Sequence, residues 1–346
     1  MSKVVDHLAE LTGFRDRDVL DVTLVGAFRD LLQPESATIF RPVGDGAQQR
    51  WLTRARLRAG DSTPSADSVW IDLDDLPALD TLPDHLRCLQ SQDPVVVPVE
   101  GQVLSLFPLN TDREVCGVLE LRTAQPLRGE QSRLVSSMLR VFRNFQGLLD
   151  YSERDTLTGL LNRKTFDGSF LRVASSAVTS PAPTVPGLDE RRQPGASRTA
   201  WLGVVDIDHF KSVNDNHGHL IGDEVLLLVA RLMRSTFRYQ DQLYRFGGEE
   251  FVVLLRGGNA EQAAGAFERL RGNVHRYVFP RVGHITVSIG FTELRAGDSP
   301  SSAFERADKA VYHGKQNGRN MVVHHGDLIT RGLLVDESRT GDMELF

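Results

Sequence analysis

Residues 243–255 read Leu-Tyr-Arg-Phe-Gly-Gly-Glu-Glu-Phe-Val-Val-Leu-Leu, so two apolar runs flank a Gly-Gly pair. Such runs predict a β-hairpin, because the turn needs positive φ angles that glycine adopts readily. Without a Cβ, Gly247 and Gly248 also let a phosphate or a base approach the backbone. The adjacent carboxylates of Glu249 and Glu250 offer the hard oxygen ligands that divalent cations prefer. The hairpin tip is therefore either a metal–phosphate site or a pair of solvated acids.

A second acidic strand end favours the metal site. Residues 201–211 read Trp-Leu-Gly-Val-Val-Asp-Ile-Asp-His-Phe-Lys, an apolar strand that ends in Asp206 and Asp208. Because side chains alternate along a strand, both carboxylates lie on one face and Ile207 points the other way. Two acids at a strand end are typical of two-metal nucleotidyl-transfer sites. The alternative is a strand edge that runs into a polar loop.

Composition limits the classes of function. A chain of 346 residues is long enough for two domains, and 40% hydrophobic with 25% charged residues is typical of a soluble globular protein. A net charge of −6 argues against a general nucleic-acid binder but does not exclude nucleotides. The two cysteines, Cys88 and Cys116, lack the spacing of metal ligands. No apolar run approaches membrane-spanning length, and the first residues lack the apolar core of a signal peptide. We therefore expect a cytoplasmic protein with neither nucleic acid nor membrane as a partner.

The first domain is expected at residues 1–150, with an α+β fold around a mostly antiparallel sheet. Residues 16–33 have the apolar spacing of a helix, and short β-prone runs follow at 37–40, 50–53, 68–71, 94–99, 103–108 and 115–121. The order helix, strands, helix resembles a GAF sensory domain, with a PAS-like sensor as the alternative. Trp51 and Trp70 line a pocket or fill the core. For Cys88, His85 and Cys116 a haem or metal site is less favoured than core cysteines and a surface histidine.

A helix is expected to join the two domains at about residues 130–153. Its apolar residues Val135, Met138, Phe142, Phe145 and Leu149 are spaced alternately three and four apart. This spacing is that of a coiled-coil seam across a dimer. The additional leucines and valine of the segment equally permit a helix that packs on its own domain, and both arrangements can hold together.

The second domain is expected at residues 154–325. Residues 155–166 form a turn in which Asn162 and Thr165 stand near the start of a helix running to about residue 174. Residues 175–199, rich in Ser, Pro, Gly and Ala, indicate a surface loop. Residues 224–237 form a strongly apolar helix. Before it, Asn214 and Asp223 could hydrogen-bond a purine edge, and Lys211 could meet a phosphate.

Five ordered motifs resemble the GGDEF domain of diguanylate cyclases. They are Asp155 to Asn162, the Asp206-x-Asp208-x-Phe210-Lys211-x-x-Asn214-Asp215 run with Gly218-His219-x-x-Gly222-Asp223, the Gly-Gly-Glu-Glu-Phe tip, residues 285–290, and residues 307–320. The resemblance implies a palm-like α/β domain with a central, mostly antiparallel sheet, related to nucleotide cyclases and polymerases. The whole chain is then α+β, a GAF-like sensor joined by a helix to a GGDEF domain.

The resemblance also implies a chemistry and its residues. Two domains of a homodimer would each bind one GTP and condense the pair into cyclic di-GMP and two pyrophosphates. Mg²⁺, with Mn²⁺ as a substitute, would be held by Asp206, the Ile207 carbonyl, Glu249 and Glu250. Glu249 would also deprotonate the attacking hydroxyl, with Lys211 as the second catalytic residue. The substrate-binding residues would be Asn214 and Asp223 for guanine, Lys315 and Arg319 for the terminal phosphates, and also His219, Phe210 and Gly248.

The same resemblance implies feedback by the product. Arg238 and Asp241, with Arg269, match the family's inhibitory cyclic di-GMP site, although an Arg and an Asp so spaced are usually a local surface ion pair. Residues 326–346 are expected to be a polar, partly ordered tail. The rival function is a non-catalytic cyclic di-GMP receptor that signals to a partner protein. A bifunctional synthase–hydrolase is not expected, because the chain leaves no room for a phosphodiesterase domain.

Overall fold

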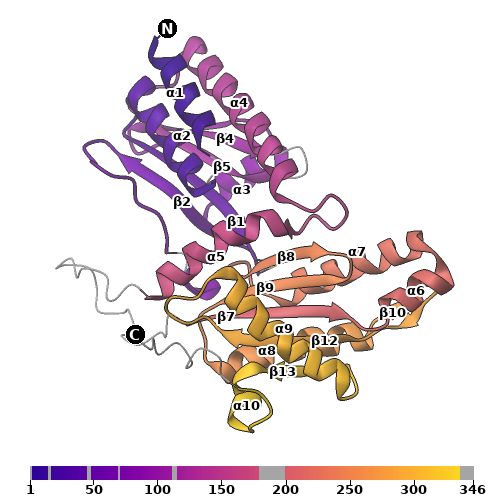
Figure 1. Ribbon diagram of the computed structural model, residues 1–346. Coiled ribbons are helices and arrows are strands. Elements are labelled where there is room, and N and C mark those ends of the chain that lie inside the picture. The colour runs from indigo at the N-terminus through magenta and orange to yellow at the C-terminus, as the bar shows by residue number, and fades with distance from the viewer. Residues whose placement is uncertain are drawn as a thin grey trace, which may run out of the picture. The chain divides into compact units, whose positions relative to one another are not determined.

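The computed structural model describes residues 2–14, 17–44, 48–68, 71–110, 115–178 and 199–335. The chain divides into two compact units, Met1–Ser152 and Glu153–Phe346, and each has its own hydrophobic core (Figure 1). Within the described ranges, no helix combines the length and the apolar character needed to cross a membrane.

The first unit is built on a five-stranded sheet with the order β2-β1-β5-β4-β3, in which all neighbouring strands are antiparallel. The strands are β1 (Ser36–Val43), β2 (Arg50–Arg58), β3 (Val95–Val99), β4 (Gln102–Asn110) and β5 (Val115–Thr123). Helices α1 (Ser2–Gly13), α2 (Arg17–Leu32) and α4 (Gly129–Glu153) contribute to the core on one face. Helix α3 (Pro83–Ser91) packs on the other, near the short 3-10 helices η2 (Leu73–Asp75) and η3 (Leu79–Thr81). The predicted mixed fold with an antiparallel sheet is confirmed.

Helix α4 packs along the core of its own unit. The seam residues Val135, Met138, Phe142 and Leu149 are buried there, and Phe145 is partly buried against the same cluster. The seam is therefore used in packing within the unit, which is one of the two arrangements that its spacing allows. Pairing of the helix across a dimer stays a prediction.

Several expectations for the first unit need correction. The sequence reading missed α1 and α3. Ser68 and Ile71 are not in a strand, since the Ile71 amide donates to the Ser68 carbonyl and not to a neighbouring strand; Val69 and Trp70 lie outside the described residues. His85 is buried instead of lying at the surface, because its Nε2 pairs with the buried Glu120 carboxylate at 2.8 Å. Trp51 fills the core, and its indole N–H donates to the Leu79 carbonyl.

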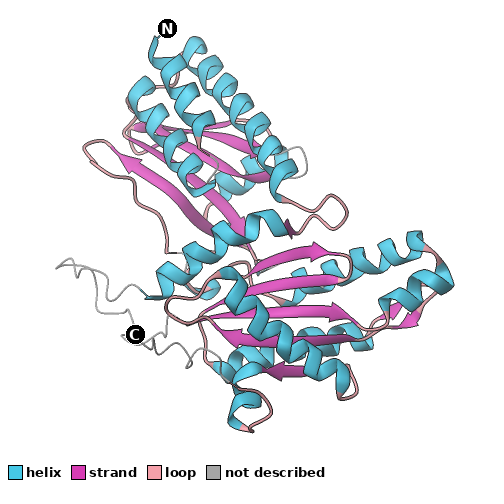
Figure 2. Cartoon of the chain, in the orientation of Figure 1, coloured by secondary structure: helices cyan, strands magenta, loops and turns pink. Residues whose placement is uncertain are grey.

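The second unit has a six-stranded sheet with the order β13-β12-β7-β9-β8-β6 (Figure 2). The strands are β6 (Leu161–Asn162), β7 (Ala200–Ile207), β8 (Gln242–Gly247), β9 (Glu250–Arg256), β12 (Val287–Glu293) and β13 (Val322–His324). The inner pairs are antiparallel, and the edge pairs β6–β8 and β12–β13 are parallel. Strands β10 (Val278–Phe279) and β11 (Gly283–His284) form a separate ribbon.

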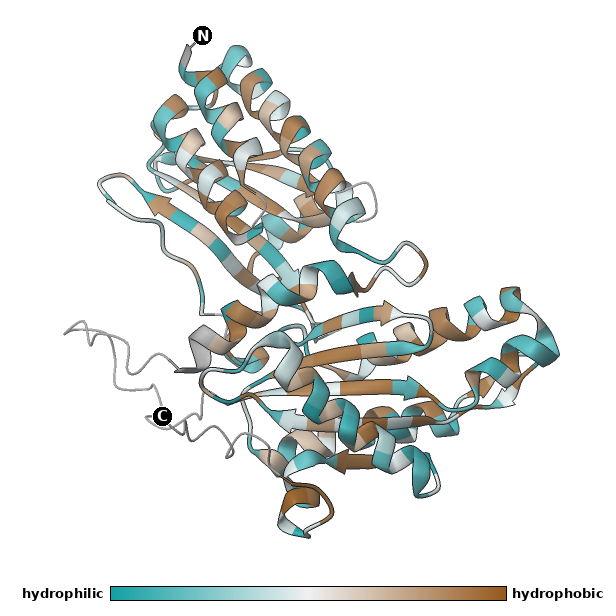
Figure 3. Cartoon of the chain, viewed as in Figure 1, coloured by the Kyte–Doolittle hydropathy of each residue, from teal (hydrophilic) through white to brown (hydrophobic). Residues whose placement is uncertain are grey.

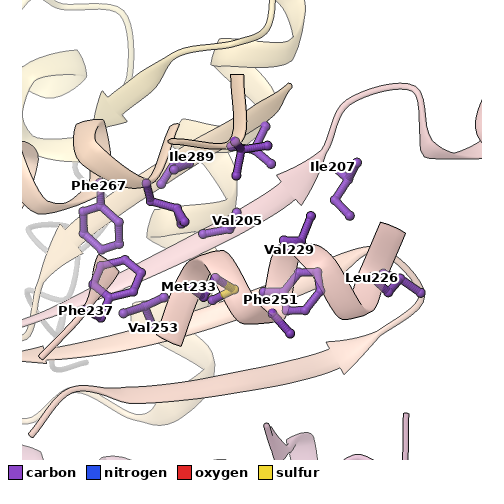
Figure 4. Packing of buried hydrophobic residues seen from close by; sticks show 14 of the residues in the cluster. Val205, Ile207, Leu226, Val229, Met233, Phe237, Phe251, Val253, Phe267 and Ile289 are labelled. Carbon is purple, nitrogen blue, oxygen red and sulfur yellow. The ribbon is translucent and has the colours of Figure 1, made fainter. Parts of the chain in front are cut away.

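Helices cover both faces of this sheet. The cluster that contains α7 (His219–Thr236) and α8 (Ala260–Arg276) lies on one face, together with residues of α6 (Phe210–His217). The cluster on the other face contains α5 (Arg163–Val178) and α9 (Pro300–Gln316). Because both faces are covered, all eight residues of β7 are buried, and the central strands are mostly hydrophobic (Figure 3). Figure 4 shows Val205, Phe251 and Val253 packed with Val229 and Met233 of α7.

The close approach of α9 to the sheet depends on a missing side chain. An ideal Cβ on Gly290 of β12 would lie 2.2 Å from the Ala307 carbonyl oxygen and 2.4 Å from the Val311 amide nitrogen. Both atoms belong to the backbone of α9, which therefore rests directly on β12. This contact fixes the helix that carries Lys315.

Two boundaries in the second unit differ from the sequence reading. Helix α5 continues to Val178, so the predicted loop at 175–199 begins later; residues 179–198 lie outside the described residues. Helix α10 (His325–Thr330) lies within the predicted polar tail, because Leu328 and His325 are buried and hold it against the unit. Residues 336–346 are outside the described residues as well.

Candidate active site

Three carboxylates gather where β7 ends and the β8–β9 hairpin turns. Asp206 is in register with Glu250 on the neighbouring strand, and the Ile207 amide donates to the Glu249 carbonyl at 3.4 Å. Asp206 is buried, whereas Glu249 and Glu250 are half-buried. The two acidic motifs, more than forty positions apart in the chain, therefore meet at one end of the sheet.

The cluster is electrostatically crowded. Burial raises the pKa of Asp206, although the Lys315 ammonium, whose Nζ lies 2.7 Å from Asp206 Oδ2, opposes the shift. Burial and then the charge of Asp206 raise the pKa values of Glu249 and Glu250, and exposed Asp308 on α9 adds to the effect on Glu250. Asp206 Oδ1 is buried and accepts no hydrogen bond among the described residues. Such a crowded set of carboxylates favours added positive charge.

Lys315 comes from the last turn of α9, and Arg319 follows in a turn where both Arg319 and Asn320 have positive φ angles. Arg319 is exposed. The sequence reading assigned Lys315 to a phosphate, whereas here it pairs with Asp206. Its ammonium thus supplies positive charge where the carboxylates are most crowded.

Asp208 has a different role from its neighbour. Its carboxylate is buried and accepts hydrogen bonds from the hydroxyls of Thr286, at 2.6 Å, and Ser288, at 2.7 Å. It also accepts the backbone amide of Asn320 at 3.0 Å. The ligand set implied by the family resemblance leaves Asp208 out, and these donors occupy its carboxylate oxygens. Instead it ties β7 to β12 and to the turn that presents Arg319.

A second tie holds the hairpin tip. The Arg245 guanidinium donates to both carboxylate oxygens of Asp155, at 3.1 and 3.2 Å, and to the Gly248 carbonyl, at 3.0 Å from Nη2. Gly247 and Gly248 have φ angles of 145° and 51°, as the turn requires, and nothing lies within 4 Å of an added Cβ. The tip is therefore open to a ligand, and its backbone is braced from the side. The sequence reading missed this brace, for which the only signal was an arginine two residues before the glycines.

The predicted nucleotide-binding residues follow β7 on α6 and the start of α7, at the end of the sheet where the hairpin turns (Figure 1). Lys211 is exposed in the first turn of α6, and His219 and Asp223 are exposed one turn apart on α7. Asn214 packs so closely on Gly222 that an added Cβ there would lie 2.0 Å from Asn214 Oδ1. The Phe210 ring is buried in the core, so that residue can meet a nucleotide only through its backbone.

Two of the predicted inhibitory residues, Arg238 and Asp241, lie at the opposite end of the sheet. Asp241 precedes β8, whose five residue steps to Gly247 span about 17 Å. Its carboxylate accepts the backbone amides of Arg238, at 2.9 Å, and Arg256, at 3.3 Å. Burial nevertheless raises the pKa of Asp241 to about 6. Arg238 and Arg269, the latter on α8, are exposed.

In the part of the chain that the structure describes, no three His, Cys, Asp or Glu side chains are arranged as a ready metal cage. The predicted ligand set consists of Asp206, Glu249, Glu250 and the Ile207 carbonyl, so its three carboxylates lie at one end of the sheet without forming such a cage. Asp206 Oδ1, buried without a hydrogen-bond donor, is the atom that a cation would satisfy. The donor set consists of hard oxygens, which fits Mg²⁺.

Comparison with known proteins agrees with the sequence motifs. Residues 188–321 match the family model described as "Diguanylate cyclase, GGDEF domain". The chain is 38% identical to diguanylate cyclase DgcP of Pseudomonas aeruginosa over 171 residues, which are 46% of this chain and 26% of that protein. It is 35% identical to diguanylate cyclase DgcZ of Escherichia coli over 185 residues, covering 52% of this chain and 56% of that protein. The chain thus matches between about a quarter and about half of these relatives' length.

Among solved structures, the GGDEF domain of DgcB from Caulobacter crescentus in complex with c-di-GMP is 35% identical, with a TM-score of 0.44. The match covers 51% of this chain and 96% of that one. The family model and the curated relatives support the same assignment as the motifs gathered around Asp206 and the hairpin tip. The second unit of this chain therefore contains a GGDEF domain.

Proposed function

We propose that this protein is a diguanylate cyclase that condenses two GTP molecules into cyclic di-GMP and two pyrophosphates. The observation that carries the proposal is the meeting of Asp206, Glu249 and Glu250 beside an open Gly-Gly turn, with Lys315 at 2.7 Å from Asp206. The names of the relatives, which this chain covers only in part, support the same reaction.

Asp206, the Ile207 carbonyl and Glu250, with Glu249 beside them, would hold Mg²⁺, or Mn²⁺ in its place. When bound, the cation supplies Lewis-acid stabilisation of the charge that develops on the α-phosphate and the leaving pyrophosphate. The unsatisfied Asp206 Oδ1 and the raised pKa values of the cluster favour such a ligand.

The reaction is a pair of in-line displacements. In each, the 3′-hydroxyl of one GTP attacks the α-phosphorus of the other, a new P–O bond forms, and the bond to the β-phosphate oxygen breaks. Glu249 accepts the hydroxyl proton, and its raised pKa brings this base closer to neutral pH. Lys211 and Lys315 neutralise phosphate charge, while Arg319 forks to the terminal phosphate. Because one unit offers one such half-site, the proposal requires a homodimer.

Guanine recognition is assigned to Asn214 and Asp223. A carboxylate can accept from the two N–H groups of the guanine edge, and the amide can complement the remaining polar atoms. His219, one turn before Asp223 on α7, assists, and Gly248 and the Phe210 backbone leave room for the nucleotide.

Product inhibition is assigned to the turn at Arg238. Asp241 fixes that turn through its two backbone hydrogen bonds, and Arg238 and Arg269 can stack on guanine and fork to phosphate. An Arg238→Ala variant with undiminished inhibition by cyclic di-GMP would remove this part of the proposal.

We assign to the first unit the role of a GAF-like sensor that regulates the cyclase through α4, which ends two residues before Asp155.

The test is incubation of the purified full chain, stripped of bound nucleotide, with GTP and Mg²⁺, followed by chromatography. We expect cyclic di-GMP from the wild type, none from Glu249→Ala, and wild-type amounts from Glu261→Ala. The control residue is an exposed glutamate in the first turn of α8. Absence of product from the wild type would reject the cyclase and leave the receptor function.

A further inference from the structure

The first unit contains a cavity of about 750 Å³ that the cyclase reaction does not use. It lies on the sheet face that also carries α3, because Thr38, Phe40 and Glu120 alternate with the residues that face α2 and α4. The segment with η2 and η3 contributes the facing wall through Leu76, Pro77 and Thr81. Its volume is within the range of cavities that hold small organic ligands.

The floor of this cavity is a polar patch on three adjacent strands. Strand pairing sets Thr38 of β1 between Arg56 of β2 and Glu120 of β5. One pleat away, the same pairing sets a second row, which consists of Arg58, Ser36 and Arg122. In-register residues share a face of the sheet, so three guanidinium groups and one carboxylate lie on this floor.

The carboxylate of the floor is already paired. Glu120 is buried, and its oxygens accept from His85 Nε2 at 2.8 Å and from Arg122 Nε at 2.9 Å. Although burial favours the protonated form, these two hydrogen bonds lower the pKa of Glu120 overall. The Glu120 carboxylate therefore already has two partners, and one of them, Arg122, has its charge neutralised by this ion pair.

Arg56 and Arg58, the other two arginines of the floor, have no carboxylate partner among the described residues. Arg56 is half-buried with its guanidinium carbon 5.8 Å from the centre of the Phe40 ring, and neither Arg56 nor Arg58 forms a side-chain ion pair with a described residue. The hydroxyls of Thr38 and Thr53 make no hydrogen bond within the described chain either. Among the acids of the lining, Asp67 accepts the Thr53 amide at 2.6 Å, and Glu35 and Asp75 are exposed at the rim.

We propose that this cavity binds a small organic anion whose carboxylate or phosphate group lies against the Arg56 guanidinium. A guanidinium fork matches both groups with paired hydrogen bonds, and a half-buried cation without a counter-ion gains most from such a partner. The Thr38 and Thr53 hydroxyls supply further donors beside it. The proposal is independent of the cyclase activity.

The test is calorimetric titration of the full chain with four probes, namely succinate and citrate as carboxylates, and glucose 6-phosphate and adenosine monophosphate as phosphates. We expect at least one probe to bind, and its class identifies the anionic group. Arg56→Gln should weaken that binding by about 10- to 100-fold, the loss typical of a hydrogen-bonded charge. Arg87→Gln, on exposed α3 surface, is the matched control and should bind as the wild type does.

Two further variants guard against loss of folding. Arg56→Lys keeps the charge but not the fork, and Thr38→Val keeps the shape but not the hydroxyl; both should weaken binding by less than Arg56→Gln. Binding of none of the four probes would overturn the proposal. So would binding that all three cavity variants leave unchanged, because the probe would then occupy another site, such as the nucleotide site.

Discussion

Replacing Asp208 by alanine removes a buried carboxylate that accepts two hydroxyls and one backbone amide. A hydrogen bond to a charged group contributes about 1.5–3 kcal/mol, so three independent bonds would sum to about 4.5–9 kcal/mol. The three share one acceptor group, and the hydroxyls can rotate toward other partners, so the contributions are not additive. We expect a loss of about 3–5 kcal/mol in the free energy of unfolding of the second unit.

Asparagine should cost much less at this position. Its carbonyl oxygen can accept from Thr286 and Asn320, which both bond Oδ2, while its amide can donate to the Ser288 hydroxyl, which bonds Oδ1. The variant then loses only the extra strength that the negative charge gives these hydrogen bonds, which we expect to cost about 1–2 kcal/mol. Asp215→Asn removes the same charge from an exposed position on α6 and should change stability by less than about 0.5 kcal/mol.

The measurement is hydrogen exchange of the full chain, followed by mass spectrometry across a urea series. Peptides that cover β7 and β12 report the second unit alone, so unfolding of the first unit does not interfere. If Asp208 acts through these hydrogen bonds, the loss in unfolding free energy should be largest for Asp208→Ala, smaller for Asp208→Asn and smallest for Asp215→Asn. Asp208→Ala with a loss below about 1 kcal/mol would refute the reasoning, because it would show that these donors find water or other partners at little cost.

Three other predictions follow from single contacts. Gly290→Ala should destabilise the second unit by at least about 2 kcal/mol in thermal unfolding, because its Cβ would meet the α9 backbone; an unchanged Tm contradicts this. Because burial raises the pKa of Asp241 to about 6 from 3.8, its carboxyl stabilises the fold fully below about pH 4, and up to about 3 kcal/mol is lost as pH rises through about 6. Asp241→Asn should remove that slope from urea titrations, and an identical slope would exclude this carboxyl as its source. Arg245→Lys should weaken the link between Asp155 and the Gly248 carbonyl by about 1 kcal/mol, which would make amide hydrogen exchange at the hairpin tip roughly fivefold faster. Equal exchange rates in the variant and the wild type would show that Arg245 does not stabilise the tip.

Much of the fold could be predicted where periodicity and turn chemistry agree. The helix at Arg17–Leu32 and the strands at Ser36–Val43 and Val115–Thr123 have alternation or spacing that matches one buried face. Helix α3 was missed because Pro83–Ser91 has only nine residues, too few for its apolar spacing to repeat more than twice. Residues 68–71 resemble a strand in composition, yet Ser68 and Ile71 are not in a strand, since composition does not show which backbone groups pair with a neighbouring strand.

The candidate site could likewise be predicted only in part from the sequence. The residue types of the strand end and the hairpin tip predicted an acidic cluster, and β7 and β9 bring Asp206 and Glu250 into register. Side-chain alternation alone could not distinguish Asp206 from Asp208, because both are acids on one face of one strand; only the family resemblance selected Asp206 as a ligand. The difference depends on Thr286, Ser288 and Asn320, which come from segments about 80 to 110 residues further along the chain.

From the sequence alone we could predict two units, helices α2, α4, α5 and α7, the strands of the first sheet and those around the acidic cluster, and the GGDEF motifs of the second unit. These features rest on local rules, namely side-chain periodicity, the φ angles open to glycine and the ligand chemistry of each residue type. Tertiary structure alone decided that Lys315 pairs with Asp206, that the Asp208 carboxylate joins β7 to later segments, and that Arg56 and Arg58 line a cavity without an ion-pair partner among the described residues. Such features depend on distances between segments far apart in sequence, and those distances are set only when the whole sheet and its helices pack together.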